Sequence, residues 1–445
     1  MKSKLQRYPH YRHSGVDWLG QVPAHWIVER AKASFREVDE RSVSGNEELL
    51  SVSHKTGVTP RRLKNVSMFK AESYLGYKLC QPGDLVVNTM WAWMAALGIS
   101  QHGGIVSNAY GVYRPREGVE MDGRYYDYLL RTEIYRSEYV RRSTGITTSR
   151  LRLYPPKLLA MPLIEPPLDE QQKIVAFLDA YTAQVHRLVA AKRREIAILV
   201  EQRDQIIEDI LVRHNIQNAS EMMLKRALNG IIGGSTPSPN AENWDGEIVW
   251  VTPPDISASD RLSSSRRTLT AEGLRNCAAN IVPAGSVILT SRAPVGNVAI
   301  AGVPLATNQG CKALVPCPDK ISTNFLALTV RRLVPLMKVL ATGTTFQEIS
   351  TARLGSMKVR MPTIDQQSAI LSDVGVEISP LQVAKERIAA EIDLITEYRD
   401  AMIIATVMGQ LDVREAEIVA AQDIDLIADM PPDDEEMEDV LEQVD

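Results

Sequence analysis

Two stretches of the chain decide its fold: PPLDEQQKIVAFL at residues 166–178 and MPTIDQQSAIL at residues 361–371. Each starts with a proline-containing turn, continues through an acidic residue to paired glutamines, and then opens a helical pattern. In both copies a mostly apolar stripe follows, with one member at every third or fourth position. This spacing predicts two long helices, over residues 166–215 and 363–411.

A stripe so long and narrow favours a second helix as its partner, so we expect the two helices to pair as a coiled coil. The alternative is that each helix packs on its own domain as ordinary core. The positions expected to pack between the helices are Ile174, Leu178, Val185, Leu188, Leu199, Ile206, Ile370, Leu381, Ile388, Ile392 and Ile395.

Both helical patterns carry local signals. Pro166 and Pro167 end the preceding strand, and Asp169 offers an N-cap for the first helix. Gly375 and Pro380 fall inside the second pattern. Because proline lacks a backbone N–H and clashes with the carbonyl four residues earlier, we expect a kink at Pro380.

Upstream of each helix, matching blocks recur in the same order. QPGDLVVNT (81–89) matches VPAGSVILT (282–290), GIVSNAYGVY (104–113) matches PLATNQGCKAL (304–314), and STGITTSRL (143–151) matches ATGTTFQEI (341–349). The offset between the copies stays close to 200 residues. These three pairs of blocks and the pair of helix starts make four matched blocks in one order, which predict a tandem duplication.

The duplicated blocks contain short β-type runs between Gly, Pro, Asn and Ser turns. We expect strands at Asp84–Asn88, Ile248–Val251 and Val287–Thr290, and helices at Tyr125–Tyr139 and Asn324–Leu340. The predicted fold class is therefore α+β, with each α+β domain followed by its long helix. The predicted segments are a first domain (1–165), a central helix (166–215), a second domain (216–362), a C-terminal helix (363–411) and an acidic tail (412–445).

The formal net charge of −5 conceals a strong asymmetry along the chain. Residues 1–165 carry a net charge of +8 and residues 216–362 a net charge of +6, whereas the tail holds 14 acidic residues and one basic residue. Two separate basic domains suit two contacts with a polyanion such as DNA, although basic and acidic patches that balance within one globule remain the alternative. The acidic tail is expected to be disordered.

Composition also restricts the location of the protein. No run approaches the roughly 20 apolar residues of a membrane span, and the first residues lack the apolar part of a signal peptide. The four scattered cysteines agree with a reducing compartment. We therefore expect a cytoplasmic protein without membrane contact.

Familiar catalytic motifs are absent from the sequence. It contains no G-x-x-x-x-G-K-[ST] phosphate loop, no Asn-Pro-Pro-aromatic methyltransferase signature, no Asp/Glu-x-Lys nuclease core, and no histidines at metal-ligand spacing. We expect no enzyme chemistry and no bound metal in this chain alone.

Several further stretches resemble one protein family, the specificity subunits of type I restriction-modification systems. The resemblance lies in SGVDWLGQVPAHW (14–26), GGSTPSPNAENWDGEIVWVTPPDI (233–256), TSRAPVGNVAI (290–300) and MGQLDVRE (408–415), together with the duplicated domain-helix order. It covers about residues 8–415, and the break at Gly375 and Pro380 and the acidic tail depart from it.

The resemblance implies that each α+β half is a target recognition domain for one part of a bipartite site in double-stranded DNA. It also implies that the two helices pair antiparallel, separate the half-sites and dock two methyltransferase subunits. Those partners would bring S-adenosylmethionine, and restriction subunits would bring ATP and Mg²⁺. The chain itself would bind no cofactor. An interaction scaffold that does not read DNA is the alternative function.

DNA readout combines basic side chains on phosphates with Arg, Asn and Gln side chains at base edges. The expected DNA-binding residues are Arg61, Arg62, Lys64, Asn108, Thr147, Thr148 and Arg150 in the first domain, and Arg292, Asn308, Gln309, Lys312, Thr344, Thr345 and Gln347 in the second. The alternative for each Arg or Lys is a solvated surface charge. For Asn108 and Asn308 the alternative is a hydrogen bond within their own turn.

Overall fold

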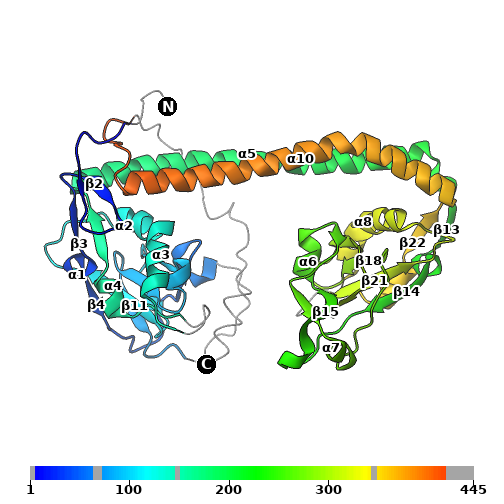
Figure 1. The fold of residues 1–445 in the computed structure, drawn as a ribbon, viewed down its shortest axis with the longest axis horizontal. Coiled ribbons are helices and arrows are strands. Elements are labelled where there is room, and N and C mark those ends of the chain that lie inside the picture. The colour runs from blue at the N-terminus through cyan, green and yellow to red at the C-terminus, as the bar shows by residue number, and fades with distance from the viewer. Residues whose placement is uncertain (1–5, 64–72, 146–150, 342–347, 417–445) are drawn as a thin grey trace. The chain divides into compact units, whose positions relative to one another are not determined.

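The computed structural model describes residues 6–63, 73–145, 151–341 and 348–416, which form two compact units (Figure 1). Unit 1 comprises Met1–Glu195 and Arg387–Asp445, and unit 2 comprises Ile196–Glu386. Two long helices, α5 (Leu168–Arg213) and α10 (Ile364–Val407), each contribute to both units. The mixture of helices and strands confirms the α+β class, and both long helices lie where the apolar stripes predict them.

Unit 1 is built on a four-stranded antiparallel sheet. Its strand order is β4 (Phe35–Val38), β11 (Tyr110–Pro115), β8 (Leu85–Asn88) and β9 (Leu97–Ile99). The core combines Leu85 of the sheet and Tyr125 of α2 (Gly123–Leu130) with Ile174 and Leu178 of α5. The start of α5 is therefore part of the core of unit 1.

Smaller elements complete unit 1. They are β1 (Tyr11–His13) with β2 (Gln21–Pro23), β3 (Ile27–Arg30) with β12 (Pro162–Glu165), β5 (Leu50–Ser53) with β6 (Gly57–Pro60), β7 (Lys78–Cys80) with β10 (Gly104–Val106), the helices α1 (Ala31–Ser34), α3 (Glu133–Arg142) and α4 (Pro155–Leu159), and the 3₁₀ turns η1 (Arg61–Leu63) and η2 (Ala92–Met94).

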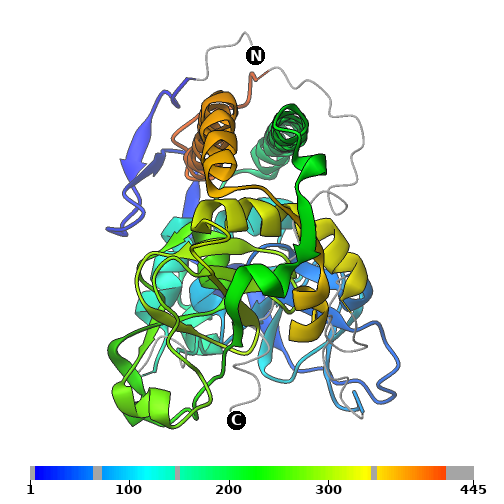
Figure 2. The ribbon, with the colours of Figure 1, turned by 90° about the vertical axis from the view of Figure 1, so that its right-hand side faces the viewer.

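Unit 2 has the same central strand order, with one strand added. Its sheet runs β14 (Leu228–Gly233), β21 (Cys311–Pro316), β18 (Val287–Thr290), β19 (Val298–Ala301) and β16 (Arg261–Leu262), and only β16 is parallel to its neighbour. Helix α8 (Thr323–Leu340) joins residues from α5 and α10 in one core cluster. Figure 2 views the ribbon from the side of this unit.

The remaining elements of unit 2 are β13 (Ser220–Met223) with β22 (Lys358–Met361), the sheet β17 (Arg267–Leu269), β15 (Trp244–Val251) and β20 (Leu305–Thr307), the helices α6 (Pro253–Ala258), α7 (Ala271–Arg275) and α9 (Thr351–Ser356), and the 3₁₀ turns η4 (Ile216–Asn218), η5 (Leu224–Ala227) and η6 (Ala241–Asn243). Across the described ranges of the chain, no helix has both the length and the apolar character needed to cross a membrane.

Local expectations are partly confirmed. The strand at Val287–Thr290 is observed, and α8 starts one residue before the expected helix. The single helix expected at Tyr125–Tyr139 is wrong, because α2 ends at Leu130 and Thr132 caps a separate helix, α3, by accepting a hydrogen bond from the backbone N–H of Tyr135.

The start of α5 differs from expectation, whereas the kink expected at Pro380 stays a prediction. Asp169 is not the N-cap of α5, because the helix already begins at Leu168 and the Pro167 carbonyl accepts the first backbone bonds. Helix α10 runs through Gly375 and Pro380 without ending. The carbonyl that Pro380 leaves without a donor belongs to Val376, which is exposed and can be hydrated.

The acidic tail begins later than expected. Val413 is 2% exposed and belongs to the core of unit 1, and Asp412 pairs with Arg414. The expectation of disorder is therefore wrong for residues 412–416, where burial of Val413 fixes the chain. Residues 417–445 lie outside the described residues.

A buried glutamine fastens the start of each long helix to its unit. The Gln171 side chain donates to the Pro166 carbonyl (2.8 Å) and accepts from the backbone N–H of Asp122 (2.8 Å), which caps α2. Gln367 donates to the Pro362 (3.1 Å) and Lys320 (2.7 Å) carbonyls.

Gln367 also accepts a hydrogen bond from the backbone N–H of Ser322 (2.9 Å), the residue that caps α8. Gln171 therefore corresponds to Gln367, and not to Gln366 as alignment of the two Gln-Gln pairs would imply. In each unit one amide connects the long helix to the cap of the helix beside the sheet.

Replacing Gln367 with leucine leaves the Ser322 N–H and two carbonyls without this buried partner. At about 1–3 kcal/mol per unsatisfied group, we expect a loss of roughly 3 kcal/mol and a fall in melting temperature of about 6–12 °C. Gln171→Leu should act similarly in unit 1. The exposed neighbour Gln172 supplies the control, and equal melting temperatures for Gln172→Leu and Gln171→Leu would contradict the assignment.

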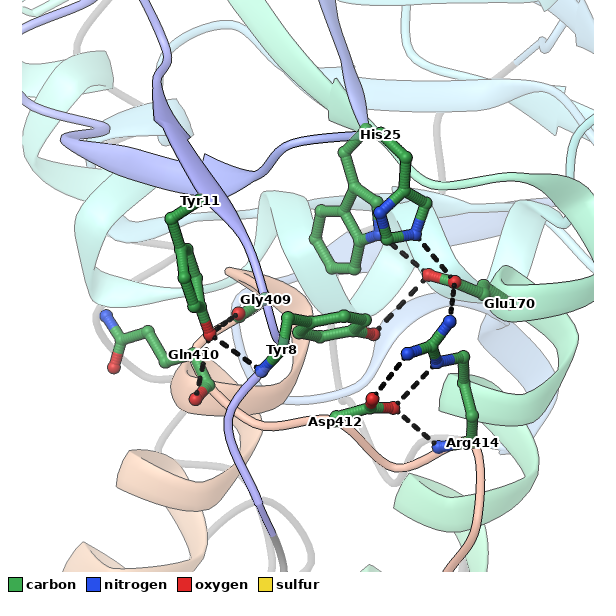
Figure 3. A network of polar contacts seen from close by, with 9 residues as sticks. Tyr8, Tyr11, His25, Glu170, Gly409, Gln410, Asp412 and Arg414 are labelled. Carbon is green, nitrogen blue, oxygen red and sulfur yellow. Dashed lines mark hydrogen bonds and ion pairs between the residues drawn. The ribbon is translucent and has the colours of Figure 1, made fainter.

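Unit 1 contains a second fastening at the same turn of α5 (Figure 3). The buried Glu170 carboxylate accepts hydrogen bonds from Trp26 Nε1 (2.7 Å) and from the Tyr8 hydroxyl (3.4 Å). His25 Nε2 lies 2.7 Å from Glu170 Oε1, and Arg414 Nη1 lies 3.4 Å from the same oxygen. One carboxylate thus contacts both the N-terminal segment and the segment that follows α10.

Further bonds hold these two segments together. The Tyr11 hydroxyl donates to the Gly409 carbonyl (2.9 Å), and Gln6 forms a β-bridge with Asp412. A hydrogen bond from Arg414 holds the pKa of the Asp412 carboxyl below its usual range. Because the folded-state pKa is lowered, this pair stabilises the fold at neutral pH and loses its effect as the pH falls below about 4.

Glu170→Ala should destabilise unit 1 by about 3–5 kcal/mol, because it leaves the buried Trp26 indole N–H without its acceptor and removes the buried charge that lies against His25 and Arg414. Intrinsic tryptophan fluorescence, to which Trp26 contributes, reports the loss during denaturation, and limited proteolysis after α10 reports release of residues 408–416. Asp169→Ala, one residue away and exposed, is the control. Unchanged protease resistance of Glu170→Ala would show that the carboxylate does not hold the segment.

Candidate nucleic-acid interface

Three chain segments that were singled out separately in the sequence converge at one end of the central sheet in unit 2. The backbone N–H of Ser291, just after β18, donates to the Gly310 carbonyl (2.8 Å), just before β21. The N–H of Ile349 donates to the Ser291 carbonyl (3.0 Å). Because Ile349 is fully buried in the core, it anchors the third segment against the other two.

The side chains at this junction form a compact charged group. Glu348 accepts hydrogen bonds from Arg292 Nε (2.8 Å) and Lys312 Nζ (3.1 Å), and Lys312 also contacts Ser291 Oγ (3.2 Å). Burial acts to raise the pKa of the Glu348 carboxyl, but the hydrogen bonds from Arg292 and Lys312 outweigh it and hold that pKa below its usual range. The Arg292 side chain is 42% exposed, whereas that of Lys312 is only 7% exposed.

The other candidate side chains of unit 2 are only partly described. Asn308 Oδ1 accepts from the backbone N–H of Gly310 (3.0 Å), so the turn bond named as its alternative role is present. Gln309 is exposed and accepts from the Thr236 hydroxyl. Thr344, Thr345 and Gln347 lie outside the described residues, immediately before Glu348.

Unit 1 brings the matching segments together in the same way. Thr89, just after β8, donates from its hydroxyl to the Ala109 carbonyl (2.7 Å), and its own carbonyl accepts from the backbone N–H of Leu153 (2.9 Å). Leu153 is fully buried, like Ile349 in unit 2. The neighbouring Asn108 accepts from Arg41 Nη1 (3.1 Å).

The basic loop expected in unit 1 lies beside this region. Arg61 and Arg62 form η1, where the backbone N–H of Arg61 bonds to the Leu49 carbonyl (2.9 Å) and Arg62 Nε lies 3.1 Å from a Glu48 carboxylate oxygen. Leu49 in turn forms a β-bridge with Ile105. Lys64, Thr147, Thr148 and Arg150 lie outside the described residues.

Two residues at these junctions were not selected from the sequence. Arg41 holds Asn108 and pairs with Asp39 (2.9 Å), but no motif surrounds it. Glu348 lies inside the repeated block 341–349, but an acidic residue carries no donor for DNA, so its sequence gives no signal of a role there.

Unit 1 also contains a cavity of about 810 Å³ between α2, α3 and the two long helices. Its walls carry oppositely charged neighbours that pair with one another, including Arg124 with Asp179 (2.7 Å) and Arg136 with Glu133 (2.8 Å). Pairing within the walls leaves little net field to select a charged ligand.

The expected helix-packing positions have different environments. Ile174, Leu178, Val185, Ile370 and Ile388 are buried, Leu199, Ile206, Leu381, Ile392 and Ile395 are half-buried, and Leu188 is 47% exposed. Ile174 and Leu178 pack into the core of unit 1 and Ile370 into that of unit 2, as the alternative of ordinary domain core anticipates.

Polar contacts also join α5 and α10 inside each unit. Lys192 Nζ lies 2.8 Å from Glu391 in unit 1. In unit 2 Arg213 pairs with Glu377, and His214 Nε2, just after α5, lies 2.8 Å from Asp373.

Comparison with known proteins gives consistent matches. The family model described as type I restriction modification DNA specificity domain matches residues 226–374. The type I restriction enzyme MjaIX specificity subunit of Methanocaldococcus jannaschii is 35% identical over 144 residues, covering 32% of this chain and 33% of that protein. The EcoR124I/EcoR124II specificity subunit of Escherichia coli is 25% identical over 263 residues, covering 56% of this chain and 63% of that protein.

Among solved structures, the HsdS subunit from Thermoanaerobacter tengcongensis aligns with a TM-score of 0.38 and 17% identity, covering 88% of this chain and 98% of that chain. This chain therefore spans about one third of the length of the MjaIX subunit and less than two thirds of the length of the EcoR124I/EcoR124II subunit. The family model and the two curated relatives confirm the family resemblance inferred from the sequence.

Proposed function

Because residues 226–374 carry a type I restriction-modification DNA specificity domain, we propose that this chain selects the DNA sequence on which such a complex acts. The observation that carries the proposal is the convergence of the same three loops in both units. Each junction combines a basic side chain with an amide side chain, Arg41 with Asn108 in unit 1 and Arg292 near Asn308 and Gln309 in unit 2. Each unit would read one half of a bipartite site.

The charge distribution supports double-stranded DNA as the ligand. The two domain segments are basic, with net charges of +8 and +6, although the whole chain is acidic. Basic groups neutralise phosphates, and Arg, Asn and Gln side chains read base edges in the major groove. We place this activity in the cytoplasm, where chromosomal DNA is available to such a complex.

The duplicated organisation extends to the helices. The shared strand order of the two central sheets and the equivalent roles of Gln171 and Gln367 support a tandem duplication of one domain-helix module. Within unit 1, Lys192 pairs with Glu391, while the earlier Tyr181 lies close to the later Tyr398 and Arg399. This reversed order supports antiparallel pairing of α5 and α10 as a coiled coil.

The long helices also expose apolar side chains that can receive protein partners. In unit 1 these are Leu188 (47% exposed), Leu394 (65%) and Tyr398 (62%), and in unit 2 they are Ile198, Val376 and Val383. Leu394 and Tyr398 are four residues apart and share one helix face. We assign these two surfaces to two methyltransferase subunits, which bring S-adenosylmethionine; restriction subunits would add ATP and Mg²⁺. The chain itself would be non-catalytic.

Expression of the chain with its methyltransferase subunit should create one split motif of N6-methyladenine, with two short half-sites and a fixed gap. Long-read sequencing of the host DNA measures it. Exchanging residues 216–362 for those of another specificity subunit should change only one half-site. Absence of any new motif, given a purified complex and an active methyltransferase, would favour the scaffold alternative.

The double variant Leu394→Asp, Tyr398→Asp should weaken binding of the methyltransferase subunit by at least about tenfold. Exposed apolar residues that become buried on assembly contribute most of the binding free energy of an interface. Co-purification and calorimetric titration measure the effect. Asp393→Asn, on the same helix, is the control. DNA binding by the free chain should stay unchanged, and full retention of the complex would exclude this surface.

A further inference from the structure

Glu348 is a carboxylate at the junction that we expect to face DNA. A negative charge close to the phosphate backbone is unfavourable unless cations neutralise it. Glu348 meets two cations, Arg292 and Lys312, so the three side chains together carry one positive charge.

The fold of the unit does not by itself demand an acidic residue here. In unit 1 the backbone N–H of Leu153 bonds to the Thr89 carbonyl, just as that of Ile349 bonds to the Ser291 carbonyl in unit 2. The residue before Leu153 is Arg152, whereas the residue before Ile349 is Glu348. Arg152 forms its β-bridge with Thr144, whereas Glu348 forms its β-bridge with Arg292, so the pairing of the Glu348 carboxylate with Arg292 is particular to unit 2.

The geometry of the contact shows what that role can be. Glu348 accepts from Nε of Arg292, and the two residues also form a β-bridge. The Arg292 backbone and its Nε atom are therefore both held against Glu348. Among the described residues, Nη1 and Nη2 of Arg292 have no hydrogen-bond partner, and the side chain is 42% exposed. These two amino groups can donate in parallel to two adjacent acceptors, such as O6 and N7 of guanine.

Lys312 contacts the same carboxylate from the buried side of the junction. Its ammonium group is almost fully buried and contacts Ser291 Oγ and the second oxygen of Glu348, at 3.2 and 3.1 Å. A group so buried is poorly placed to touch DNA directly. It instead fixes the carboxylate in the orientation that Arg292 requires.

We propose that Glu348 is a positioning residue for the second half-site, holding the Arg292 guanidinium so that its two terminal amino groups read a guanine in the major groove. This inference rests on the proposed function. It assigns Lys312 to the support of Glu348 and leaves Arg292 as the residue that touches the base.

The test compares methylation motifs for the full chain assembled with its methyltransferase subunit. Glu348→Ala should relax one guanine position of the second half-site, with a roughly tenfold loss of discrimination at that base pair. The first half-site should remain unchanged. Glu348→Gln keeps an oxygen acceptor for Arg292 Nε and should restore most of the discrimination.

A double-variant cycle separates positioning from a merely structural role. If Glu348 acts through Arg292, Arg292→Ala combined with Glu348→Ala should relax the motif no further than Arg292→Ala alone. A further loss in the combined variant would overturn the proposal.

Loss of Glu348 alone strands the buried ammonium of Lys312, which can prevent folding. The variant Glu348→Ala with Lys312→Met removes both charges, and it should fold and still show the relaxed guanine position. Retention of full discrimination in this folded variant would overturn the inference.

Glu221→Ala supplies the matched control. Glu221 also contacts two cations of unit 2, Lys358 (2.8 Å) and Arg360 (3.6 Å), and its side chain is 38% exposed against 33% for Glu348. It lies on β13, and its variant should keep the wild-type motif. A wild-type chain that directs no split motif would defeat the proposed function itself, whereas an intact wild-type motif with unaltered Glu348 variants would defeat only this inference.

Discussion

The fold of each unit depends on one buried amide. Gln171 and Gln367 stand in the first turn of a long helix and satisfy backbone groups that would otherwise be buried without partners. Because an unsatisfied buried group costs about 1–3 kcal/mol, the long helix can start only where the cap of the neighbouring helix meets it. Sheet, capped helix and long helix are thus fixed to one another, and the loops at the end of the sheet inherit a defined position.

In each unit a carboxylate also gathers several hydrogen-bond donors. Glu170 gathers an indole, an imidazole and a guanidinium at the start of α5, and Glu348 gathers a guanidinium and an ammonium at the loop junction of unit 2. Glu170 is shielded from water, where charge-assisted hydrogen bonds are strong and loss of one partner is costly, whereas Glu348 is one-third exposed. The first holds chain segments together, and the second orients a side chain toward a ligand.

The two units use a common framework with different surface chemistry. Both close the loop junction with a buried aliphatic residue, Leu153 or Ile349. The polar groups around it differ: Arg41 holds Asn108 in unit 1, whereas Asn308 bonds to its own turn and Arg292 is held by Glu348 in unit 2. Under the proposed function, recognition of two different half-sites would require such a division, in which the core is shared and the exposed donors are not.

The sequence by itself determined the long helices, the repeated blocks and the family resemblance, because periodic apolar spacing and turn residues act locally. It failed at helix boundaries, where neighbouring residues compete as caps: Thr132 starts a second helix after the first has ended, and Pro167, not Asp169, opens α5. Only the tertiary structure showed that Lys312 is buried and that Glu348 lies against Arg292, residues separated by 56 positions. Such contacts leave no periodic trace, because they depend on how strands bring remote loops together.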